Sequence, residues 1–490
     1  MKKLRILILI TALVMLLCGC DAVVDPQSSV LGAYVDSENN QQDSEEAVKT
    51  EMSVLYYKDM DTNPVTTTCY ANSELLKLIY SPLVRVDDTF KPYCVLAESF
   101  TRDETTVTVR LRSGLVFSDG SAVTATDVVK SFDTAKNNAG SPYNRQTSCM
   151  TRYYAQDEQT FVCVFSRQVG DVEAMLDIPV MKNGEAGIGC GPYVFSEKNG
   201  KNVLVVNEQY FERANVPVIY LVETKNDENI TNLFSAGELD VISSAQSSSL
   251  SLTSMRDYSI ISAPSNNLIY IGVNYASEFL SDPAVRRALS VALDRDRLAE
   301  QSLVGLADPA RYPFNPCWYR MSQMPSSVPD AENPIPLLSG KTFSMLVPSG
   351  SDIKKAVADG IAENLKSAQV TINITEAAPD EFEAAVKSGA YDLYLGETAI
   401  SRTMDPTFLY KTGGSMNYLG FSDEGLDAEY EKLKNGEISL SEYLSAFSEK
   451  MPLIPVVFRK NVMYCDKNIT GFCDMSPWNS FGNFTAVKLK

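Results

Sequence analysis

The chain has 490 residues, 44% hydrophobic and 21% charged, a composition typical of globular proteins. Its formal net charge of −19 argues against nucleic-acid binding, which needs clustered Lys and Arg, and against adhesion of the folded part to anionic lipid. The complete absence of histidine excludes Ser-His-Asp and Cys-His catalysis and nearly all catalytic zinc sites. Only carboxylate, Lys, Tyr or Ser-Lys mechanisms remain, so we expect no enzymatic activity, no cofactor and no metal ion bound by the protein's own side chains.

The N-terminal segment has the pattern of a secretory signal. A positively charged start precedes an apolar run, Ile6 to Leu17, that is much shorter than the roughly 20 residues of a membrane-spanning helix. The run ends at Leu17-Cys18-Gly19-Cys20, which resembles the lipobox of bacterial lipoproteins. The resemblance implies that residues 1–19 are a signal peptide and that Cys20 carries a lipid. A plain signal peptide with an incidental cysteine is the alternative.

The next segment, residues 20–50, is rich in Ser, Asp, Glu, Asn and Gln and has few large apolar residues. Such a segment buries too little surface to offset its ordering entropy, so we predict a flexible linker. The remaining ~440 residues exceed what one hydrophobic core usually supports, which predicts more than one domain. No later apolar stretch is long enough to span a membrane, so the lipid is the expected attachment.

The first half of the remaining chain is predicted to be rich in strands. Residues 105–112 alternate apolar and polar side chains, as a half-buried strand does. Thr124 and Asp127 have the spacing of a helix capping box. Further strands are predicted at residues 161–165, 203–207 and 268–274. Of the eight cysteines beyond Cys20, Cys149 with Cys163 and Cys465 with Cys473 are close enough in sequence to pair, and no pairing is favoured.

A helix is predicted to start at Pro283, because Ser281 and Asp282 supply a capping residue just before a proline. Its apolar positions form one stripe. We expect the charged side chains to lie mostly on the other face as solvated ion pairs; they are Arg286, Arg287, Asp294, Arg295 and Asp296.

Residues 341–397 are predicted to fold in the order β-α-β-α-β, which implies parallel strands joined by right-handed crossovers. Ligands of such sheets bind beyond the carboxyl ends of the strands, so the loop from Gly396 to Pro406 is a candidate site. The chain then returns through the Pro-rich segment 452–458 to a β-rich tail. An α/β part between β-rich segments predicts two lobes with a cleft between them.

Seven collinear segments, which together cover most of the chain from about residue 52 onward, resemble family-5 solute-binding proteins of ABC transporters, the oligopeptide- and dipeptide-binding group. The most specific is VTVRLRSGLVFSDGSAVTATDVVKSF, with its strand, Asp-Gly turn and Thr-Ala-x-Asp-Val helix start. The others are IYSPLVRVDDTFKPYCVLAESF, GCGPYVF, AGELDV, IGVNYASEFLSDPAVRRALSVALDRDRL, YDLYLG with MDPTFLY, and MPLIPV.

The resemblance implies an α/β, two-lobe periplasmic-binding-protein-like fold (class II type, cluster C) with a small domain inserted in the first lobe. Lobe I is expected to be discontinuous, and hinges are expected near Tyr275–Leu280 and Phe458. The implied ranges are 51–80, 189–277 and 459–490 for lobe I, 81–188 for the inserted domain, and 278–458 for the α/β lobe II.

The resemblance also implies a peptide site between the lobes. Its walls would be Thr68, Cys69 and Tyr70; Asn274 and Tyr275; and residues 396–402 followed by Asp405. Backbone groups there would pair with an extended peptide, and water-filled pockets would take its side chains.

Two departures from the family pattern affect this site. Gly396-Glu397 stands where the family commonly has Gly-Trp. Arg402 falls near the position where peptide binders have an Asp that pairs with the ligand's α-ammonium, in a loop that looks about two residues longer. An arginine there would favour a carboxylate or phosphate, and Glu397 could bind the ammonium instead. The alternative is that both side chains point to solvent.

The implied function is that of an extracytoplasmic substrate-binding lipoprotein of an ABC importer. It would be a monomer, held by its lipid on the outer face of the cytoplasmic membrane, that binds a short peptide or peptide-like solute and delivers it to a permease. The same fold could bind a sugar, a modified amino acid or a metal chelate, or act as a sensor. A secreted carboxylate-dependent hydrolase, which needs two facing acids, is a remote alternative.

Overall fold

The computed structural model describes residues 49–167, 170–225, 229–243, 257–323 and 333–490. All of them belong to one compact unit, residues 48–490. None of the helices in these ranges is long and apolar enough to cross a membrane. The predicted signal peptide, Cys20 and most of the predicted linker lie outside the described residues.

The first sheet is four-stranded, in the order β1-β10-β9-β8. β1 (Met52–Tyr56) runs parallel to β10 (Val218–Glu223), and the other pairs are antiparallel. β9 (Lys201–Val206) confirms the predicted strand at 203–207, and β8 is Tyr193–Lys198. The short helix α2 (Tyr70–Leu76) packs against β1, and α5 (Ile230–Ser235) packs against β11 (Val241–Ser243).

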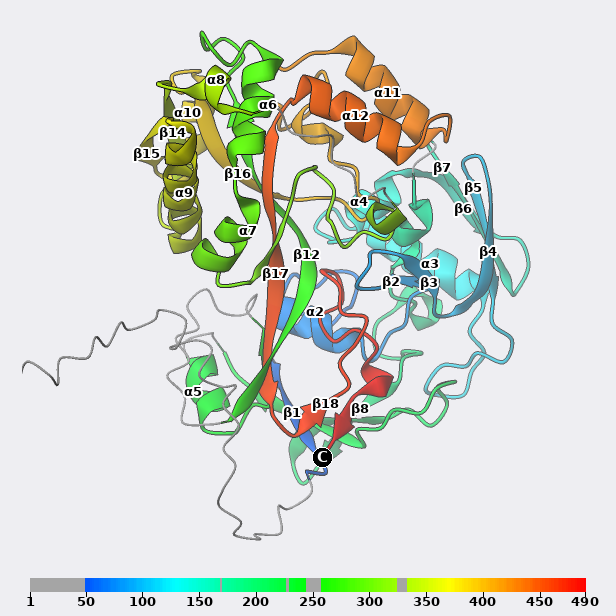
Figure 1. Ribbon diagram of the computed structural model, residues 1–490. Coiled ribbons are helices and arrows are strands. Elements are labelled where there is room, and N and C mark those ends of the chain that lie inside the picture. The colour runs from blue at the N-terminus through cyan, green and yellow to red at the C-terminus, as the bar shows by residue number, and fades with distance from the viewer. Residues whose placement is uncertain (1–48, 168–169, 226–228, 244–256, 324–332) are drawn as a thin grey trace, which may run out of the picture. The chain divides into compact units, whose positions relative to one another are not determined.

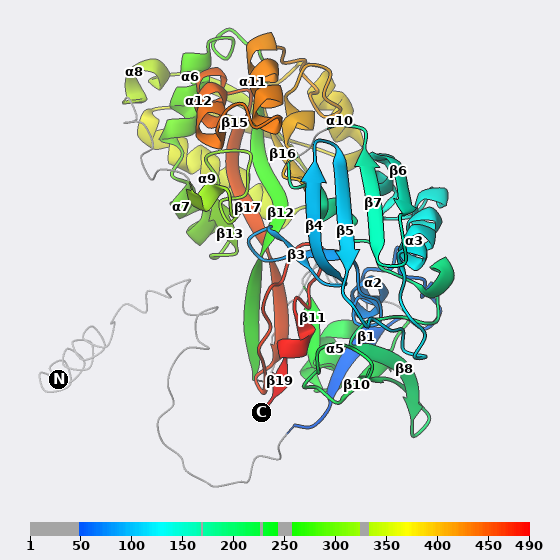
Figure 2. The ribbon, with the colours of Figure 1, turned by 90° about the vertical axis from the view of Figure 1, so that its right-hand side faces the viewer.

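A second antiparallel sheet has the order β4-β5-β7-β6, and Figure 2 shows its strands side by side. β5 (Thr106–Leu111) and β7 (Thr160–Phe165) confirm two predicted strands. The predicted capping box is also confirmed, because Thr124 and Asp127 bond to each other's backbone at the start of α3. The other elements here are β2 (Val84–Val86), β3 (Pro92–Cys94), β4 (Ala97–Asp103), α3 (Ala125–Asn137), α4 (Asn144–Ser148), β6 (Met150–Ala155), η1 (Val172–Leu176) and η2 (Lys182–Gly184).

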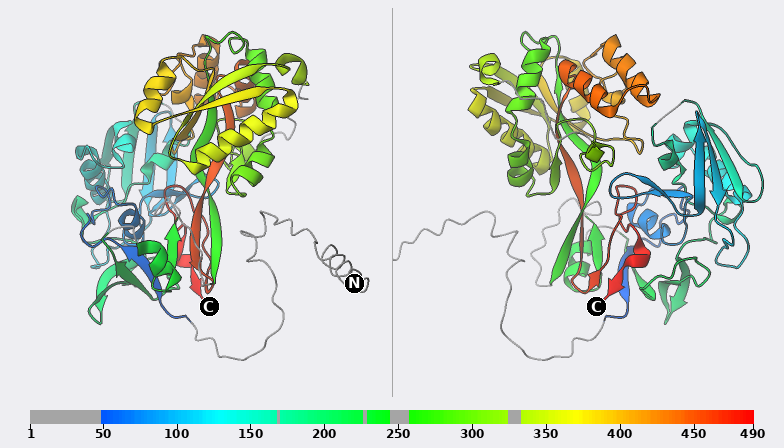
Figure 3. Two further views of the ribbon diagram at one scale, coloured as in Figure 1. Left: turned by 90° about the vertical axis from the view of Figure 1, so that its left-hand side faces the viewer. Right: turned by 45° about the vertical axis from the view of Figure 1, so that its right-hand side comes forward.

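The predicted β-α-β-α-β order is confirmed, with β14 pairing in parallel with both β15 and β16. α9 covers β14 and β15 (Figure 3, left, yellow) through Val357, Ile361 and Leu365, which are all buried. Ser351 caps α9 by accepting the backbone N–H of Lys354. The elements are β14 (Thr342–Pro348), α9 (Asp352–Leu365), β15 (Thr371–Ala377), α10 (Pro379–Lys387) and β16 (Leu393–Ala399).

Two long antiparallel strands, β12 (Tyr258–Val273) and β17 (Ile454–Asp466), lie side by side (Figure 1), and β11 pairs with the C-terminal part of β17. They belong to a seven-stranded sheet in the order β11-β17-β12-β16-β14-β15, with β13 (Ala307–Pro309) beside β17. Residues 267–273 of β12 pair with β16, and a register shift lies just before them, between Pro264 and Leu268. This pairing favours a lobe boundary nearer residues 264–268 than 277, and the predicted domain ranges stay predictions.

The remaining elements lie mainly around the α/β segment. α6 begins at Pro283 with Asp282 as its N-cap, as predicted. The full set of remaining elements is α6 (Pro283–Ala292), α7 (Arg295–Arg297), η4 (Leu298–Ser302), η5 (Met321–Gln323), α8 (Ile335–Leu338), η6 (Lys366–Ala368), η7 (Thr407–Leu409), α11 (Glu424–Lys434), α12 (Leu440–Lys450), β18 (Ile469–Thr470), η8 (Phe484–Ala486) and β19 (Lys488–Leu489).

The expectation of solvated ion pairs around α6 is wrong for two arginines. Arg286 is 4% exposed and Arg295 is 3% exposed. Their guanidinium groups donate to backbone carbonyls instead of carboxylates: Arg286 to Met451 at 2.9 Å and Arg295 to Pro455 at 2.9 Å, among others. Both arginines therefore tie the region around α6 to residues 451–455, where β17 begins.

The pairing of Cys149 with Cys163, which their sequence spacing allowed, is not found. Both are free thiols, and Cys163 is buried. Burial raises the pKa of the Cys163 thiol to about 12, so it stays protonated and inert at neutral pH. Cys473 is likewise a free thiol, and it is exposed.

Candidate functional site

Arg402 lies in the loop that follows β16 and contacts two segments from distant parts of the chain. Its guanidinium forms an ion pair with Asp177, 225 residues away, which follows η1. The Cζ atom of Arg402 lies 4.7 Å from the ring centroid of Trp478 in the C-terminal segment. The side chains of Arg402 and Asp177 are only 12% and 13% exposed. The loop predicted as a site thus meets the predicted inserted domain and lobe I at this arginine.

Charges of both signs surround Tyr143, close to this ion pair. Burial raises the pKa of the Tyr143 hydroxyl, the charge of Asp177 raises it further, and the charge of Arg402 lowers it in part. Glu74 and Arg85 act on the same hydroxyl with smaller effects. The ion pair of Arg402 and Asp177 therefore lies in a region where charges of both signs act on a buried tyrosine.

Tyr70 is connected to Arg402 through the C-terminal segment. It is the first residue of α2, and its hydroxyl lies 2.5 Å from the Oγ of Ser480, two residues after Trp478. The backbone N–H of Ser480 donates to Glu74 at 2.6 Å. The other two residues predicted for the same wall of the site are Thr68 and Cys69. Thr68 is exposed, and Cys69 is half-buried as the N-cap of α2.

Asn274 and Tyr275 bond mainly to residues of the predicted lobe II. The Nδ2 of Asn274 donates to the carbonyls of Gly389 at 2.9 Å and Tyr391 at 3.0 Å, and its Oδ1 accepts the N–H of Ala276. The Tyr275 hydroxyl donates to the carbonyl of Pro452. These bonds fix the end of β12, and a part for either residue in ligand binding stays a prediction.

Glu397 lies within β16 instead of in the loop, and two cations already balance its charge. Arg459 lies 2.9 Å and Lys354 3.4 Å from its carboxylate oxygens, and the carboxylate side chain is 15% exposed. A ligand ammonium would have to displace both cations to bind there. The geometry therefore favours a structural ion-pair cluster over the predicted ammonium site.

Gly396 is required by the close approach of Tyr270 on the neighbouring strand. A Cβ at residue 396 would lie 2.4 Å from the Cζ of Tyr270. We expect Gly396→Ala to lower the free energy of unfolding by about 1–3 kcal/mol, because the buried ring has to move. Chemical denaturation measures the loss, and Gly140→Ala, where the added Cβ meets only the Asn138 side chain at 3.4 Å, is the control. Equal stability of the two variants would contradict this packing.

Asp405 shapes the loop that carries Arg402. Its Oδ1 accepts the backbone N–H of Thr407 at 3.0 Å and the Thr407 hydroxyl at 2.5 Å, and its own N–H donates to Ser401 at 3.1 Å. These bonds start the η7 turn. In the described contacts Asp405 therefore holds the loop in place.

A second bridge, not predicted from the sequence, lies at the other end of η1. Asp171 accepts hydrogen bonds at 2.6 Å from both the Tyr319 hydroxyl and Arg320. The Arg320 guanidinium lies 5.4 Å from the ring of Trp318. The chain has two tryptophans, and each contacts an arginine that bridges to η1. No local sequence pattern marks the two bridges, because their partners lie 149 and 225 residues apart in the chain.

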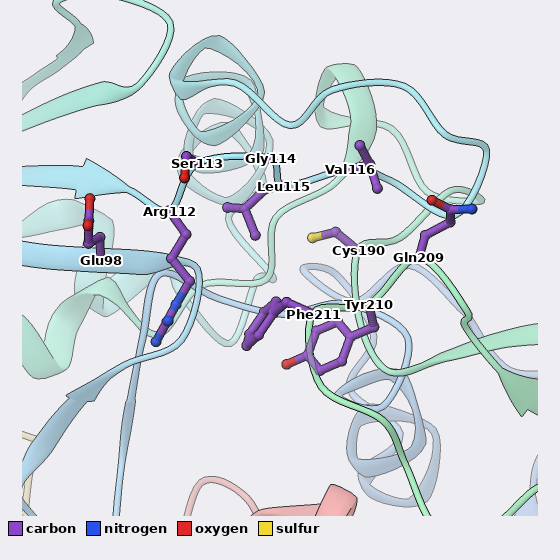
Figure 4. A pocket seen from close by; sticks show the side chains of 10 residues that line it. All are labelled: Glu98, Arg112, Ser113, Gly114, Leu115, Val116, Cys190, Gln209, Tyr210 and Phe211. Carbon is purple, nitrogen blue, oxygen red and sulfur yellow. The ribbon is translucent and has the colours of Figure 1, made fainter.

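A cavity of about 330 Å³ lies elsewhere, between the β4–β5 region and residues 209–211 (Figure 4). Arg112 packs over the ring of Phe211 at 5.1 Å, and its Nε donates to the carbonyl of Val95. None of the predicted site residues lines it. Its lining residues are Glu98, Arg112, Ser113, Gly114, Leu115, Val116, Cys190, Gln209, Tyr210 and Phe211.

Comparison with known proteins decides the family. The model of the bacterial extracellular solute-binding proteins, family 5 Middle, matches residues 91–419, which is more than half of the chain. The chain belongs to this family.

Solved structures agree on the predicted two-lobe fold. The unliganded open form of the periplasmic murein tripeptide-binding protein MppA has a TM-score of 0.75 at 18% identity, covering 90% of this chain and 97% of that one. A nickel ABC transporter protein of Bacillus halodurans has a TM-score of 0.73 at 17% identity, covering 90% and 100%.

Among curated relatives, the oligopeptide-binding protein AppA of Bacillus subtilis (strain 168) is 26% identical over 282 residues, 52% of this chain and 51% of AppA. The chain thus spans about half the length of AppA in this match. The glutathione-binding protein GsiB of Salmonella typhi is 22% identical over 452 residues, 81% of this chain and 86% of GsiB.

Proposed function

We propose that this family-5 protein is the solute receptor of an ABC importer, which captures a short peptide or peptide-like solute between its lobes and delivers it to a permease. The observation that carries the proposal is the position of Arg402. From the loop after β16 it reaches Asp177 and Trp478, in a largely buried centre with charges of both signs. The names of two relatives, oligopeptide-binding protein AppA and glutathione-binding protein GsiB, support the solute class.

The proposal extends to the membrane and the domains. Cys20 carries the lipid, which holds a monomeric receptor on the outer face of the cytoplasmic membrane, and residues 20–50 are its tether. The domains follow the ranges predicted from the sequence, with the first hinge moved toward residues 264–268 because β12 pairs with β16 from residue 267 onward. No catalytic residue is assigned.

The solute's carboxylate is proposed to bind at Arg402, since a guanidinium binds a carboxylate through two parallel hydrogen bonds. Glu397 is a weaker candidate for the ammonium end, because Arg459 and Lys354 hold it. The solute is therefore recognised mainly by an acidic terminus, unlike a peptide held first by its ammonium.

Native mass spectrometry of the protein purified from its own host tests the proposal. Gentle denaturation releases any co-purified molecule, and we expect masses of a short peptide or a peptide mixture. A single sugar or metal-chelate mass would overturn the peptide assignment and keep the receptor role. Chemical conversion of the released molecule on incubation with fresh protein would contradict the receptor role and favour a hydrolase.

A further inference from the structure

Asp177 forms an ion pair with the guanidinium of Arg402, the group to which the carboxylate of the proposed solute would bind. We propose that its carboxylate is an internal competitor of the solute's carboxylate at Arg402, and thereby sets how strongly the protein prefers acidic over uncharged solute ends. This inference rests on the proposed function, because it concerns the same site.

The contacts of Arg402 restrict how a second carboxylate can approach its guanidinium. One edge of the guanidinium, at Nη1, is bound by Oδ2 of Asp177, and its face is covered by the ring of Trp478. An incoming carboxylate therefore either replaces Asp177 or binds beside it. In both cases the negative charge of Asp177 opposes binding, and it does so strongly because both side chains are largely removed from water.

The other charges near this pair have partners of their own. Glu74 is bound by Lys77 and by the N–H of Ser480, and Arg85 donates to the carbonyl of Lys77 at 2.8 Å. Asp177 is the counter-ion that the structure gives to Arg402. Removing its charge therefore leaves the guanidinium available to a solute, with the neighbouring charges unchanged.

The second bridge supplies a matched control. Asp171 and Asp177 flank the same short helix η1, and each is bound by an arginine from the predicted lobe II. Asp171→Asn also weakens a bridge, but it does not change the charge beside Arg402. A general effect of loosening the lobes is thus separated from a specific effect on carboxylate binding.

The test uses the full chain and two probes: an equimolar tripeptide pool with free C-terminal carboxylates and the same pool with C-terminal amides. Half-saturating concentrations are measured by thermal-melt titration. In Asp177→Asn we expect about tenfold tighter binding of the free-acid pool and no change for the amide pool, a difference of about 1.4 kcal/mol. Asp177→Ala should act in the same direction, whereas Asp171→Asn should shift both pools equally.

Each other result has a definite meaning. Unchanged or equally tighter binding of both pools in Asp177→Asn would overturn the inference and reduce Asp177 to a bridge between segments. Weaker binding of both pools in Asp177→Asn, without the same loss in Asp171→Asn, would assign Asp177 to the solute's ammonium, which also overturns it. Binding of neither pool to the unmodified protein would remove the peptide assignment itself, and the inference with it.

Discussion

Replacement of Arg402 by Gln is expected to weaken binding of the solute about 10- to 100-fold. A hydrogen bond to a charged group contributes about 1.5–3 kcal/mol, and 1.4 kcal/mol corresponds to a factor of ten in Kd. Glutamine keeps a polar group of similar reach but loses the charge and the bidentate geometry. Isothermal titration of the solute recovered from the purified protein measures the change.

Arg320→Gln is the matched control for this variant. It removes the guanidinium of the other bridge, at Asp171, and leaves the loop of Arg402 intact. We expect the two variants to melt at similar temperatures, with the larger loss of affinity in Arg402→Gln. If Arg402→Gln binds the solute as tightly as the unmodified protein, the guanidinium is a structural bridge only.

Replacement of Arg295 by Met is expected to lower the free energy of unfolding by about 2–4 kcal/mol. Its guanidinium donates to the carbonyls of Ala310 at 2.8 Å, Pro455 at 2.9 Å and Ser290 at 2.7 Å. Each buried carbonyl left without a donor costs about 1–3 kcal/mol, offset in part because a buried charge is removed. That charge is itself costly, since burial lowers the pKa of the Arg295 guanidinium.

Urea denaturation measures this loss, read as the shift of the first unfolding transition because two lobes need not unfold together. Arg297→Met is the control. Arg297 is exposed and donates to Gln301 one helical turn away, so its loss should change stability by at most about 0.5 kcal/mol. Similar effects of the two substitutions would contradict the structural role of Arg295.

Regular patterns made much of the α/β segment predictable. The spacing of Val357, Ile361 and Leu365 identified α9, and the Asp-Pro start identified α6, because both signals lie within a few neighbouring residues. Arg295 was misjudged because charge alone suggests exposure. The carbonyls that make its burial tolerable belong to Ala310 and Pro455, which its own sequence neighbourhood does not reveal.

At the candidate site, too, local signals were predictable from the sequence and long-range partners were not. The family resemblance pointed to Arg402, but its partners Asp177 and Trp478 come from segments that only the folded chain brings together. The family resemblance also pointed to Asn274, yet its side-chain amide donates to the carbonyls of Gly389 and Tyr391. A position in a motif predicts where a residue lies, whereas its hydrogen-bond partners decide what it is free to do.

A crystal structure of the protein bound to its co-purified solute is the decisive measurement for the proposed site. We expect the solute between the lobes, with an acidic group on the guanidinium of Arg402 and close to Trp478. A solute bound elsewhere, for example in the cavity beside Arg112 and Phe211 (Figure 4), would contradict it.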